Sequence, residues 1–201
     1  MEARKLLVLD LDETLIYATE AELARPSDHQ VGHYFIYRRP HLREFLAHVA
    51  KSFDVAVWTA STRLYADAIC KQIFEYEPSF IWARDRCTHR RNVESDTWEH
   101  HKSLAKIKRR GYDLAGVIAV DDTPEKYAKS YGNLVRVSPF WGDLGDDELP
   151  YLASYLDTLA QVANVRAVEK RGWRSRVDQS AFPAYSSPNY SLKRTDQSLR
   201  D

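Results

Sequence analysis

The chain of 201 residues carries 29 basic and 29 acidic side chains, and 44% of its residues are hydrophobic. This length and composition suit one globular domain with a substantial core, and the balanced charge gives no reason to expect binding to nucleic acid or to an anionic membrane surface. No stretch approaches the roughly 20 apolar residues of a membrane span. The N-terminus lacks the pattern of a signal peptide, so we expect a cytoplasmic protein.

The first predicted element is a buried strand over residues 5–9, which ends in the run Asp10-Leu-Asp12, with the hydroxyl of Thr14 two residues further on. Because side chains alternate along a strand, the carboxylates of Asp10 and Asp12 can converge at its carboxyl end. Two such charges repel unless a cation lies between them or one carboxyl group keeps its proton. Both arrangements suit phosphoryl transfer, with one Asp attacking phosphorus and its neighbour protonating the leaving oxygen. A strand end whose acids cap a turn is the alternative.

Helical and extended patterns alternate along the rest of the chain. Apolar residues recur at intervals of three and four in the helical patterns and form short continuous runs in the extended ones. The expected elements are a helix after Arg39-Pro40 with apolar residues from 42 to 49, a strand over 53–59, a helix with apolar residues from 65 to 73, a helix over 102–110, a strand over 116–120, a strand over 134–137 and a helix over 146–162. This alternation predicts an α/β fold with a doubly wound parallel sheet covered on both faces.

Two stretches fit the alternation poorly, residues 16–38 and residues 74–101, and we expect them to form short insertions near the functional edge of the sheet. Neither is long enough for a large cap domain. The second is rich in arginine between residues 84 and 91, where a solvated loop and a site for a second phosphate or an acidic segment are both open. Composition divides the chain into a domain over residues 1–173 and a flexible polar tail over residues 174–201.

The loop after the second strand, Thr59-Ala60-Ser61, is a candidate phosphate site. A hydroxyl and backbone amides at the entry to a helix can bind phosphate oxygens through hydrogen bonds and the helix dipole. A plain N-cap is the commoner role of Thr or Ser at such a position. Lys102, at the expected start of a helix, could reach the same phosphate as a compact positive charge, although an isolated lysine is more often solvated surface.

A third strand is expected to end at Asp121-Asp122, just before a Thr-Pro pair. The acids there can merely complement a helix dipole, because Thr suits the cap and Pro the first helical position. Magnesium prefers oxygen ligands, so Asp10, a backbone carbonyl near Asp12 and one carboxylate of the pair would also make a suitable shell. The histidines of the chain lack the cysteine partners at tight spacing that are typical of a zinc site.

Taken in order, these residues resemble the haloacid dehalogenase superfamily, and specifically its branch of small C-terminal-domain phosphatases, the NLI-interacting-factor-like proteins. The resemblance covers most of the chain. Its motifs are Asp10-Leu-Asp-Glu-Thr14, Arg39-Pro40, Val57-Trp-Thr-Ala-Ser61 with Tyr65-Ala-Asp67, Lys102, Val120-Asp-Asp-Thr-Pro124 and Tyr131-Gly-Asn133. Each motif is modest evidence alone, whereas the ordered set is strong.

The resemblance implies a magnesium-dependent phosphomonoesterase that acts on phosphoproteins through an aspartyl-phosphate. Asp10 would be the phosphorylated nucleophile, Asp12 the acid for the leaving group and then the base for water, and Thr14 a residue that orients the loop. The full set of candidates is Asp10 and Asp12 for catalysis, Thr14, Thr59, Ala60 and Lys102 for phosphate, and Asp10, Asp12, Asp121 and Asp122 for the metal. The sequence does not decide which of Asp121 and Asp122 is the direct metal ligand. The other residue would support the metal or Lys102 indirectly.

Two other functions are open at this stage. A receiver-like signalling module also joins acids, a Thr and a Lys around magnesium, but it places the acid pair on its first strand and the phosphorylated Asp on a middle one. A scaffold could keep the fold and bind phosphorylated partners without catalysis, with a basic tail as docking arm, since residues 166–201 contain eight basic and four acidic side chains. A phosphorylated protein or peptide is the expected partner, and the physiological substrate and the oligomeric state are not predicted.

Overall fold

The central sheet is parallel, as the alternation of helices and strands predicts. The computed structural model describes residues 4–92 and 97–177. Its main sheet has five strands in the order β10–β9–β1–β5–β6, and every neighbouring pair is parallel. The strands are β1 (Lys5–Leu9), β5 (Phe53–Trp58), β6 (Ile81–Trp82), β9 (Val117–Asp121) and β10 (Leu134–Arg136). Short continuous apolar runs form these strands because both faces of the sheet are covered.

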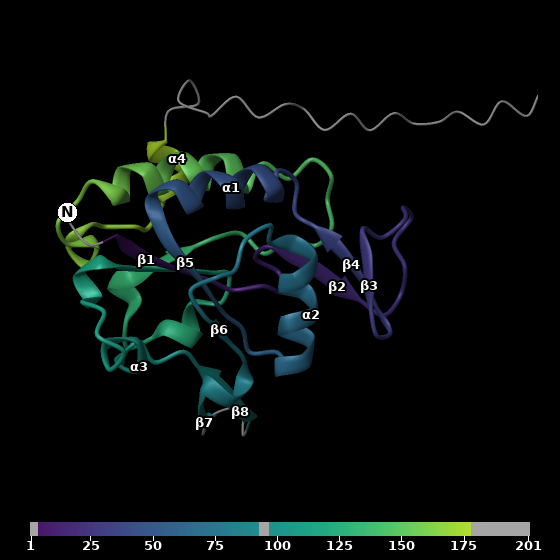
Figure 1. Ribbon diagram of the computed structural model, residues 1–201, viewed down its shortest axis with the longest axis horizontal. Helices are drawn as coiled ribbons and strands as arrows, with labels where there is room; N and C mark the ends of the chain where they lie inside the picture. Colours follow the sequence, from purple (N-terminus) through teal and green to yellow (C-terminus); the bar gives the residue numbers. More distant parts are fainter. Residues whose placement is uncertain (1–3, 93–96, 178–201) are drawn as a thin grey trace, which may run out of the picture.

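Helices lie on both faces of this sheet. The helices α1 (Leu42–Ser52) and α4 (Glu148–Ala160) pack against each other over one face, where Figure 1 shows them in the upper layer. The helix α2 (Arg63–Ile73) joins the same apolar cluster. The short α3 (Ala105–Lys108) contributes to a second cluster on the opposite face. The doubly wound α/β fold predicted from the sequence is therefore confirmed.

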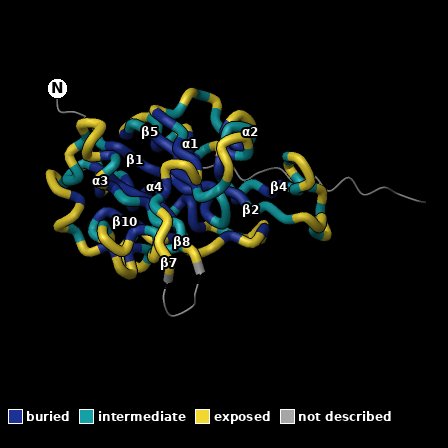
Figure 2. The backbone as a smooth tube through the Cα atoms, turned by 90° about the horizontal axis from the view of Figure 1, so that it is seen from below, coloured by how far each residue is buried: buried dark blue, intermediate teal, exposed yellow. Residues whose placement is uncertain are grey.

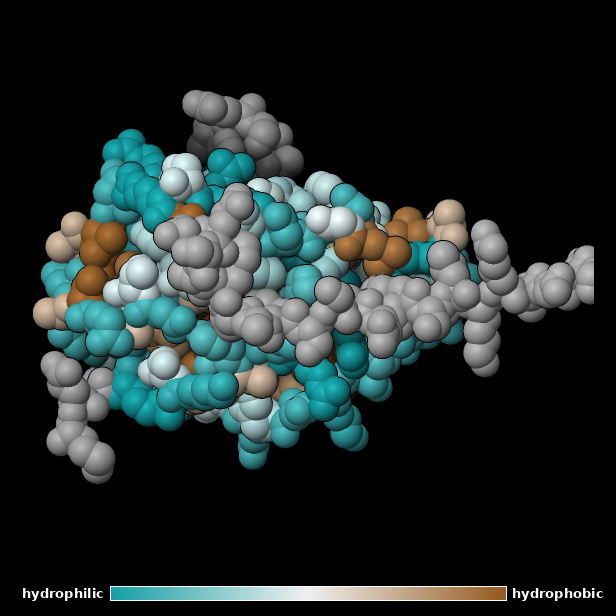
Figure 3. Space-filling model, turned by 90° about the horizontal axis from the view of Figure 1, so that it is seen from above, coloured by the Kyte–Doolittle hydropathy of each residue, from teal (hydrophilic) through white to brown (hydrophobic). Residues whose placement is uncertain are grey.

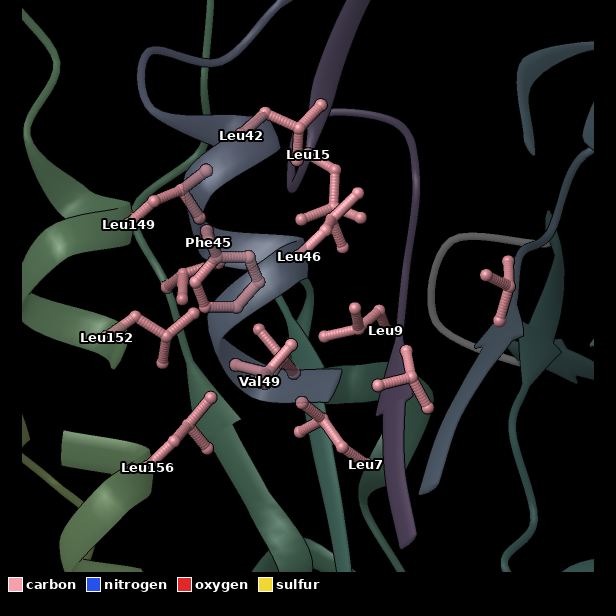
Figure 4. Packing of buried hydrophobic residues seen from close by; sticks show 14 of the residues in the cluster. Leu7, Leu9, Leu15, Leu42, Phe45, Leu46, Val49, Leu149, Leu152 and Leu156 are labelled. Carbon is pink, nitrogen blue, oxygen red and sulfur yellow. The ribbon is translucent and has the colours of Figure 1, made fainter. Parts of the chain in front are cut away.

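The larger apolar cluster fills the space between α1, α4 and the sheet. Figure 4 shows Phe45 and Val49 of α1, Leu9 of β1 and Leu152 of α4 meeting there. All four side chains are fully buried, and burying one of this size contributes roughly 1.5–3 kcal/mol. The apolar residues recur every three or four positions along α1, so one face of the helix is buried. Figure 2 shows the same order across the molecule, with buried strands at the centre and exposed segments outside.

The first predicted insertion folds into a small antiparallel sheet in the order β2–β4–β3. Gly32 lies in the tight turn between two of its strands, with a φ of 61° in the left-handed region that favours glycine. Figure 1 shows this sheet projecting at one end of the molecule. Its strands are β2 (Ile16–Thr19), β3 (His29–Val31) and β4 (Tyr34–Arg38).

The second predicted insertion is only partly outside the central sheet. The strand β6 lies within residues 74–101 and pairs with β5, so this part continues the sheet. The strands β7 (Thr88–Asn92) and β8 (Thr97–His101) then form an antiparallel hairpin. In the described part of the chain, these two small units are the only additions at this side of the fold, which confirms the prediction of short insertions without a large cap.

The helix expected over residues 102–110 is wrong at its start, because α3 begins only at Ala105. The backbone N–H of Lys102 donates to the carbonyl of Lys126 over 2.8 Å, and the Lys102 side chain is buried. Residue 102 is therefore not helical, and its side chain lies in the interior just before α3 begins. The helix expected at Thr123 also differs, since the chain forms a short 3-10 segment over Pro124–Tyr127.

The last described residues lie against the body of the domain. Arg174 Nη2 is 2.5 Å from Asp147 Oδ1 at the start of α4, so the first residues of the predicted tail over 174–201 have contacts with the domain. Residues 178–201 lie outside the described residues. The face shown in Figure 3 is mainly hydrophilic, with apolar side chains in separate small areas. Within the described ranges, no helix combines the length and the apolar composition that a bilayer crossing requires.

Candidate active site

The carboxyl ends of three neighbouring strands bring the predicted residues to one edge of the sheet. Asp10 follows β1, Thr59 follows β5 and Asp121 ends β9. Backbone hydrogen bonds extend the sheet into this edge: Asp10 N–H donates to the carbonyl of Val120 over 3.0 Å, and Thr59 N–H donates to that of Trp82 over 2.9 Å. Open parallel sheets bind their ligands at this edge.

Asp10 lies in the middle of the site, and only 1% of its surface is exposed. Its Oδ1 accepts a hydrogen bond from the backbone N–H of Leu11 over 2.9 Å. Its Oδ2 lies 2.9 Å from Lys102 Nζ and 2.8 Å from Lys126 Nζ. Burial by itself would raise the pKa of Asp10, but the attraction of the two ammonium groups outweighs burial and lowers the pKa below its ordinary value of 3.8. The carboxylate is therefore ionised at neutral pH.

Asp121 is the second carboxylate of this buried group. Its Oδ2 lies 2.5 Å from Lys102 Nζ, and its Oδ1 lies 3.2 Å from Lys126 Nζ. The same Oδ1 accepts a hydrogen bond from the backbone N–H of Thr123 over 3.0 Å. Burial, and then the neighbouring charge of Asp10, raise the pKa of Asp121 to about 7. The two lysines bridge the two carboxylates, and such buried charges are tolerated because they compensate one another.

Both lysines are held as ammonium ions. Burial alone would lower the pKa of Lys102, but Asp10 and Asp121 raise it above the ordinary value of 10.5. The pKa of Lys126 is raised in the same way, chiefly by Asp10 and against the effect of burial. Lys102 was predicted from the sequence, whereas Lys126 was not. The available signal was the position of Lys126 four residues after Asp122, about one turn further along the chain.

Asp12 lies in a different environment from Asp10. Its Oδ1 accepts a hydrogen bond from the Tyr65 hydroxyl over 2.6 Å, and its Oδ2 accepts one from the Ser61 hydroxyl over 2.7 Å. Burial raises the pKa of Asp12, and these hydrogen bonds offset the effect of burial only in part. The two carboxyl groups therefore have pKa values displaced in opposite directions. Such a separation is typical of a pair in which one group acts as an acid and the other stays ionised.

The predicted phosphate-binding loop lies beside Asp12. The Thr59 side chain is buried, and its hydroxyl lies 3.5 Å from Asp12 Oδ2. The same hydroxyl oxygen accepts the backbone N–H of Ser61 over 3.0 Å, which closes a tight turn. The carbonyl of Ala60 accepts a hydrogen bond from Arg84 Nε over 2.7 Å. One arginine of the segment 84–91 thus fixes this loop, a role that was not predicted from the sequence.

Thr14 and Asp122 connect the first and the third strand ends. Thr14 Oγ1 lies 3.4 Å from Asp122 Oδ1, and the hydroxyl of Thr123 donates to Asp122 Oδ2 over 3.0 Å. The chain turns sharply just before Thr14, because Glu13 has a φ of 56°. Burial, followed by the charges of Asp12 and Asp122, raises the pKa of Glu13 to about 7. Burial and the neighbouring acidic groups at this edge of the sheet therefore favour the protonated form of Glu13.

Three of the predicted carboxylates form a group that could hold a divalent metal ion. One oxygen from each of Asp10, Asp121 and Asp122 lies within 4.8 Å of the other two. An all-oxygen donor set of this kind fits magnesium. The side chain of Asp12 lies outside this group, and both of its oxygens accept hydrogen bonds from hydroxyl groups. A contribution of Asp12 to the metal shell would therefore come from its backbone carbonyl.

A buried arginine forms hydrogen bonds with the loop that follows β1. Arg39 is only 1% exposed and forms a bidentate ion pair with Asp146, with Nε–Oδ1 and Nη2–Oδ2 distances of 2.7 and 2.8 Å. It also donates to the carbonyls of Thr14 and Ser138 over 3.0 and 2.9 Å. The loop after β1 and the segment after β10 are therefore held by one guanidinium. Arg39 was predicted only as part of a motif, and its contacts could not be predicted because its partners lie far away in the chain.

Residues 5–166 match the sequence profile of the NLI interacting factor-like phosphatase family. The chain belongs to this family. It is 28% identical over 183 residues to the CTD nuclear envelope phosphatase 1B of Danio rerio, which covers 84% of this chain and 72% of that protein. It is 31% identical over 175 residues to a probable C-terminal domain small phosphatase of Dictyostelium discoideum, covering 82% of this chain and 53% of that protein.

The fold comparison agrees with this membership. The solved structure of Fcp1, described as an essential RNA polymerase II CTD phosphatase, superposes with a TM-score of 0.53 and 22% identity, over 72% of this chain and 44% of that one. At this identity the likeness concerns the fold alone. The family match confirms the predicted branch of the haloacid dehalogenase superfamily and the predicted enzyme class, a phosphatase. It favours neither the receiver-like module nor the non-catalytic scaffold.

The predicted cytoplasmic localisation is wrong. Several matching relatives are named for the nuclear envelope, among them the Danio rerio protein and the nuclear envelope morphology protein 1 of Saccharomyces cerevisiae. The latter is 29% identical over 186 residues, which cover 83% of this chain and 42% of that protein. The prediction depended on the lack of a signal-peptide pattern and of a long apolar stretch. Neither feature determines the compartment in which a folded domain acts.

Proposed function

We propose that this protein is a magnesium-dependent phosphoprotein phosphatase that works through an aspartyl-phosphate intermediate on Asp10. The observation that supports this most directly is the environment of Asp10, a buried and ionised carboxylate with ammonium groups at 2.9 and 2.8 Å and two further carboxylates beside it. An anionic nucleophile can approach an anionic phosphoryl group only where positive charge offsets their repulsion. The lysines supply part of that charge.

In the first step, a carboxylate oxygen of Asp10 attacks phosphorus, and the bond from phosphorus to the leaving oxygen breaks. Asp12 gives its proton to that leaving oxygen. This assignment is supported by the position of Asp12 two residues from Asp10, and by the hydroxyls of Tyr65 and Ser61, which orient its carboxyl group. In the second step, Asp12 takes a proton from water, the water oxygen attacks phosphorus, and the bond between phosphorus and Asp10 breaks.

The remaining groups of the site hold phosphate and metal in this proposal. Lys102 and Thr59, with the backbone around Ala60, bind oxygens of the phosphoryl group, and Thr14 orients the loop of the nucleophile. Magnesium would be held by the side chains of Asp10, Asp121 and Asp122, and the backbone carbonyl of Asp12 would complete the protein ligands. When bound, magnesium supplies positive charge that stabilises the transferring phosphoryl group.

The proposed substrates are phosphorylated proteins. Relatives of this chain are named as CTD phosphatases and C-terminal domain phosphatases. The described chain adds only the small sheet β2–β4–β3 and the hairpin β7–β8 to the central fold, so a polypeptide segment has room to approach the edge that carries Asp10.

Turnover of an aryl phosphate tests the chemistry. We expect hydrolysis that requires magnesium, is abolished by a chelator, and falls on the order of 10⁴-fold or more in Asp10→Asn. Asp12→Asn should lose about 10²–10⁴-fold. It should also accumulate a phosphoprotein that survives acid and is cleaved by hydroxylamine, because an acidic leaving group needs little help whereas the attack of water needs a base.

Asp54→Asn is the matched control. Asp54 lies near the start of β5, at the amino end of the sheet and therefore opposite to the site, and it is partly exposed. Its replacement should leave turnover within about twofold of the wild type, because surface substitutions of this kind have small effects. Metal-independent turnover, or an Asp10→Asn variant as active as the control, would reject the mechanism.

A further inference from the structure

A groove of about 840 Å³ runs along β10, the edge strand of the central sheet. One side is formed by the residues that end and follow β10, and the other by the segment from 166 to 174. Apolar side chains of Leu134, Val137 and Trp173 lie within it, and all three are largely buried. The groove is not part of the acidic site described above.

The walls of the groove are fixed by hydrogen bonds. Lys170 is 6% exposed, and its Nζ donates to the carbonyls of Gly132 over 2.8 Å and Val168 over 2.9 Å, and also to that of Val165. Trp173 Nε1 donates to the carbonyl of Arg136 over 2.7 Å. The segment after α4 is thereby tied to β10 at several points. The groove exists before any ligand binds, which reduces the entropic cost of binding.

Two arginines of this groove have no partner in the described structure. Arg136 and Arg166 are exposed, and neither guanidinium forms a hydrogen bond or an ion pair with another described residue. Their neighbours differ, because Arg171 pairs with Glu169 at 2.6 Å, and Arg174 pairs with the two acidic residues at the start of α4. An uncommitted guanidinium is suited to bind a carboxylate or a phosphate through two parallel hydrogen bonds.

The groove begins next to the acidic site. Pro124, which lines it, is two residues beyond Asp122. Arg136 is in register with Asp121 on the neighbouring strand, and the N–H of Val137 donates to the carbonyl of Asp121 over 3.2 Å. The strand β10 is two strands away from β1, about 10 Å at the usual spacing of a sheet. An extended peptide covers that distance with about three residues.

We propose that this groove binds an acidic segment of the phosphoprotein substrate. Carboxylates or additional phosphates of that segment would bind Arg136 and Arg166 while the phosphorylated residue lies at Asp10. The proposal rests on the proposed function, and it adds a preference for acidic residues about three to five positions from the phosphorylated residue. Charge complementarity favours this occupant, because the basic side chains that line the groove outnumber the acidic ones, Glu169 and Glu148, which already pair with two of the other lining arginines.

The test compares two phosphopeptides that differ only in carrying Glu or Gln at three to five positions on either side of the phosphorylated residue. The enzymes are the wild type, the charge-reversed double variant Arg136→Glu/Arg166→Glu, and the conservative double variant Arg136→Lys/Arg166→Lys. We expect the wild type to prefer the Glu peptide, and the reversed variant to lose at least about tenfold in kcat/KM on it, mainly through KM. Turnover of a small aryl phosphate should stay within about twofold, and the Lys variant should keep part of the preference.

Arg109→Glu is the matched control, because Arg109 is an exposed arginine after α3 that does not line the groove. It should behave like the wild type on both peptides. Equal kcat/KM values of the wild type for the Glu and Gln peptides would overturn the proposal. So would a reversed variant that loses the same factor on the aryl phosphate, or a wild-type dimer that dissociates on charge reversal, since a second copy would then be the occupant.

Binding of the same peptides to Asp10→Asn protein separates this proposal from the proposed function. If the wild type hydrolyses no phosphate ester, the proposed function fails, yet the groove still predicts that the Glu peptide binds at least about tenfold more tightly than the Gln peptide. That difference should disappear in Asp10→Asn/Arg136→Glu/Arg166→Glu. A difference in affinity that persists in this triple variant would place the acidic recognition elsewhere and overturn the proposal.

Discussion

Two buried lysines of this protein have opposite electrostatic environments. Lys102 is 1% exposed and Lys170 is 6% exposed. The ammonium group of Lys102 contacts the carboxylates of Asp10 and Asp121, whereas the partners of Lys170 among the described residues are backbone carbonyls. Burial lowers the pKa of Lys170 below its ordinary value of 10.5, while the two carboxylates overcome burial and raise the pKa of Lys102. The formal charge of the partners, and not the degree of burial, decides the direction.

This difference in partners predicts different roles for the two lysines, one in the candidate active site and one in the packing of the fold. Lys102 compensates carboxylates that would otherwise repel each other, so its removal affects both folding and chemistry. Lys170 satisfies neutral carbonyls that hold the C-terminal segment against β10, so its removal should affect packing alone. Substitution of the two lysines by an apolar residue of similar length tests this comparison directly.

The largest effect is expected for Lys102→Met. Removing one partner of a buried charge pair leaves the others uncompensated, which costs about 3–5 kcal/mol of the free energy of unfolding. Hydrolysis of an aryl phosphate should fall by at least about 10²-fold, because the contact that we propose between Lys102 and the phosphoryl group is lost. Urea unfolding with a chelator present, followed by tryptophan fluorescence, measures the first quantity.

Lys106→Met is the control for this experiment. Lys106 lies on α3 and donates from its Nζ to the carbonyls of Arg86 and Cys87 over 2.6 and 3.3 Å, and no described carboxylate pairs with it. Its replacement should cost no more than about 1 kcal/mol. If Lys102→Met unfolds at the same urea concentration as Lys106→Met, the buried carboxylates do not depend on Lys102 and the comparison fails.

Lys170→Met should have a smaller effect of a different kind. Its three carbonyl partners lose their donor, and unsatisfied buried acceptors cost about 1–3 kcal/mol in total after partial hydration. Turnover of an aryl phosphate should remain within about twofold of the wild type, because Lys170 touches none of the acidic residues of the site. Equal losses of stability in Lys170→Met and Lys102→Met would show that burial alone, and not the charge of the partners, sets the cost.

The same contrast explains how far the sequence could predict this protein. The strand end at Asp10, the acid pair at Asp121 and the loop at Thr59 could be found because each follows a short apolar run, and parallel strands end at one edge. Lys102 was predicted as a compact positive charge at the start of a helix, although that helix begins only at Ala105. Patterns of residue type thus located the groups whose chemistry is visible in the side chain.

Groups whose role depends on backbone geometry could not be found in this way. Lys126 reaches Asp10 only because a 3-10 turn follows β9, and Lys170 acts on carbonyls, which every residue carries. Arg39 and Asp146 are 107 positions apart, and the pairing of one arginine with one acid among many cannot be read from their spacing. The parallel sheet could be predicted from alternation, whereas long-range polar contacts require the folded chain.

Lys126→Met should show how the site responds to metal. Lys126 is partly exposed, so we expect a loss of only about 1 kcal/mol with a chelator present. In the proposed site, magnesium would neutralise the carboxylates of Asp10 and Asp121, which the Lys126 ammonium already contacts. The rise in melting temperature on adding magnesium should therefore be larger in Lys126→Met than in the wild type. An identical rise in both proteins would contradict the view that the two cations share ligands.

The smallest expected effect is a difference in pH dependence between the two buried lysines. A lysine whose pKa is lower in the folded protein than in the unfolded chain binds fewer protons when folded, over the range between those two values. In that range the free energy of unfolding rises with pH, so Lys170 should stabilise the wild type increasingly as pH approaches 10.5. A lysine with a raised pKa behaves in the opposite way, because its contribution is complete below 10.5 and is lost only above that value.

Urea unfolding of the wild type and Lys170→Met at pH 8 and pH 10 measures the first of these two dependences. The deficit of Lys170→Met relative to the wild type should widen between the two pH values. Comparing the two proteins at each pH cancels the titration of the tyrosines and cysteines that both share. Lys102→Met does not allow the same comparison, because the Lys102 charge lowers the pKa of Asp121, and its loss would let Asp121 titrate in the same pH range. A deficit of Lys170→Met that narrows or stays constant would mean that the backbone carbonyls do not hold the Lys170 ammonium group in the way their contacts imply.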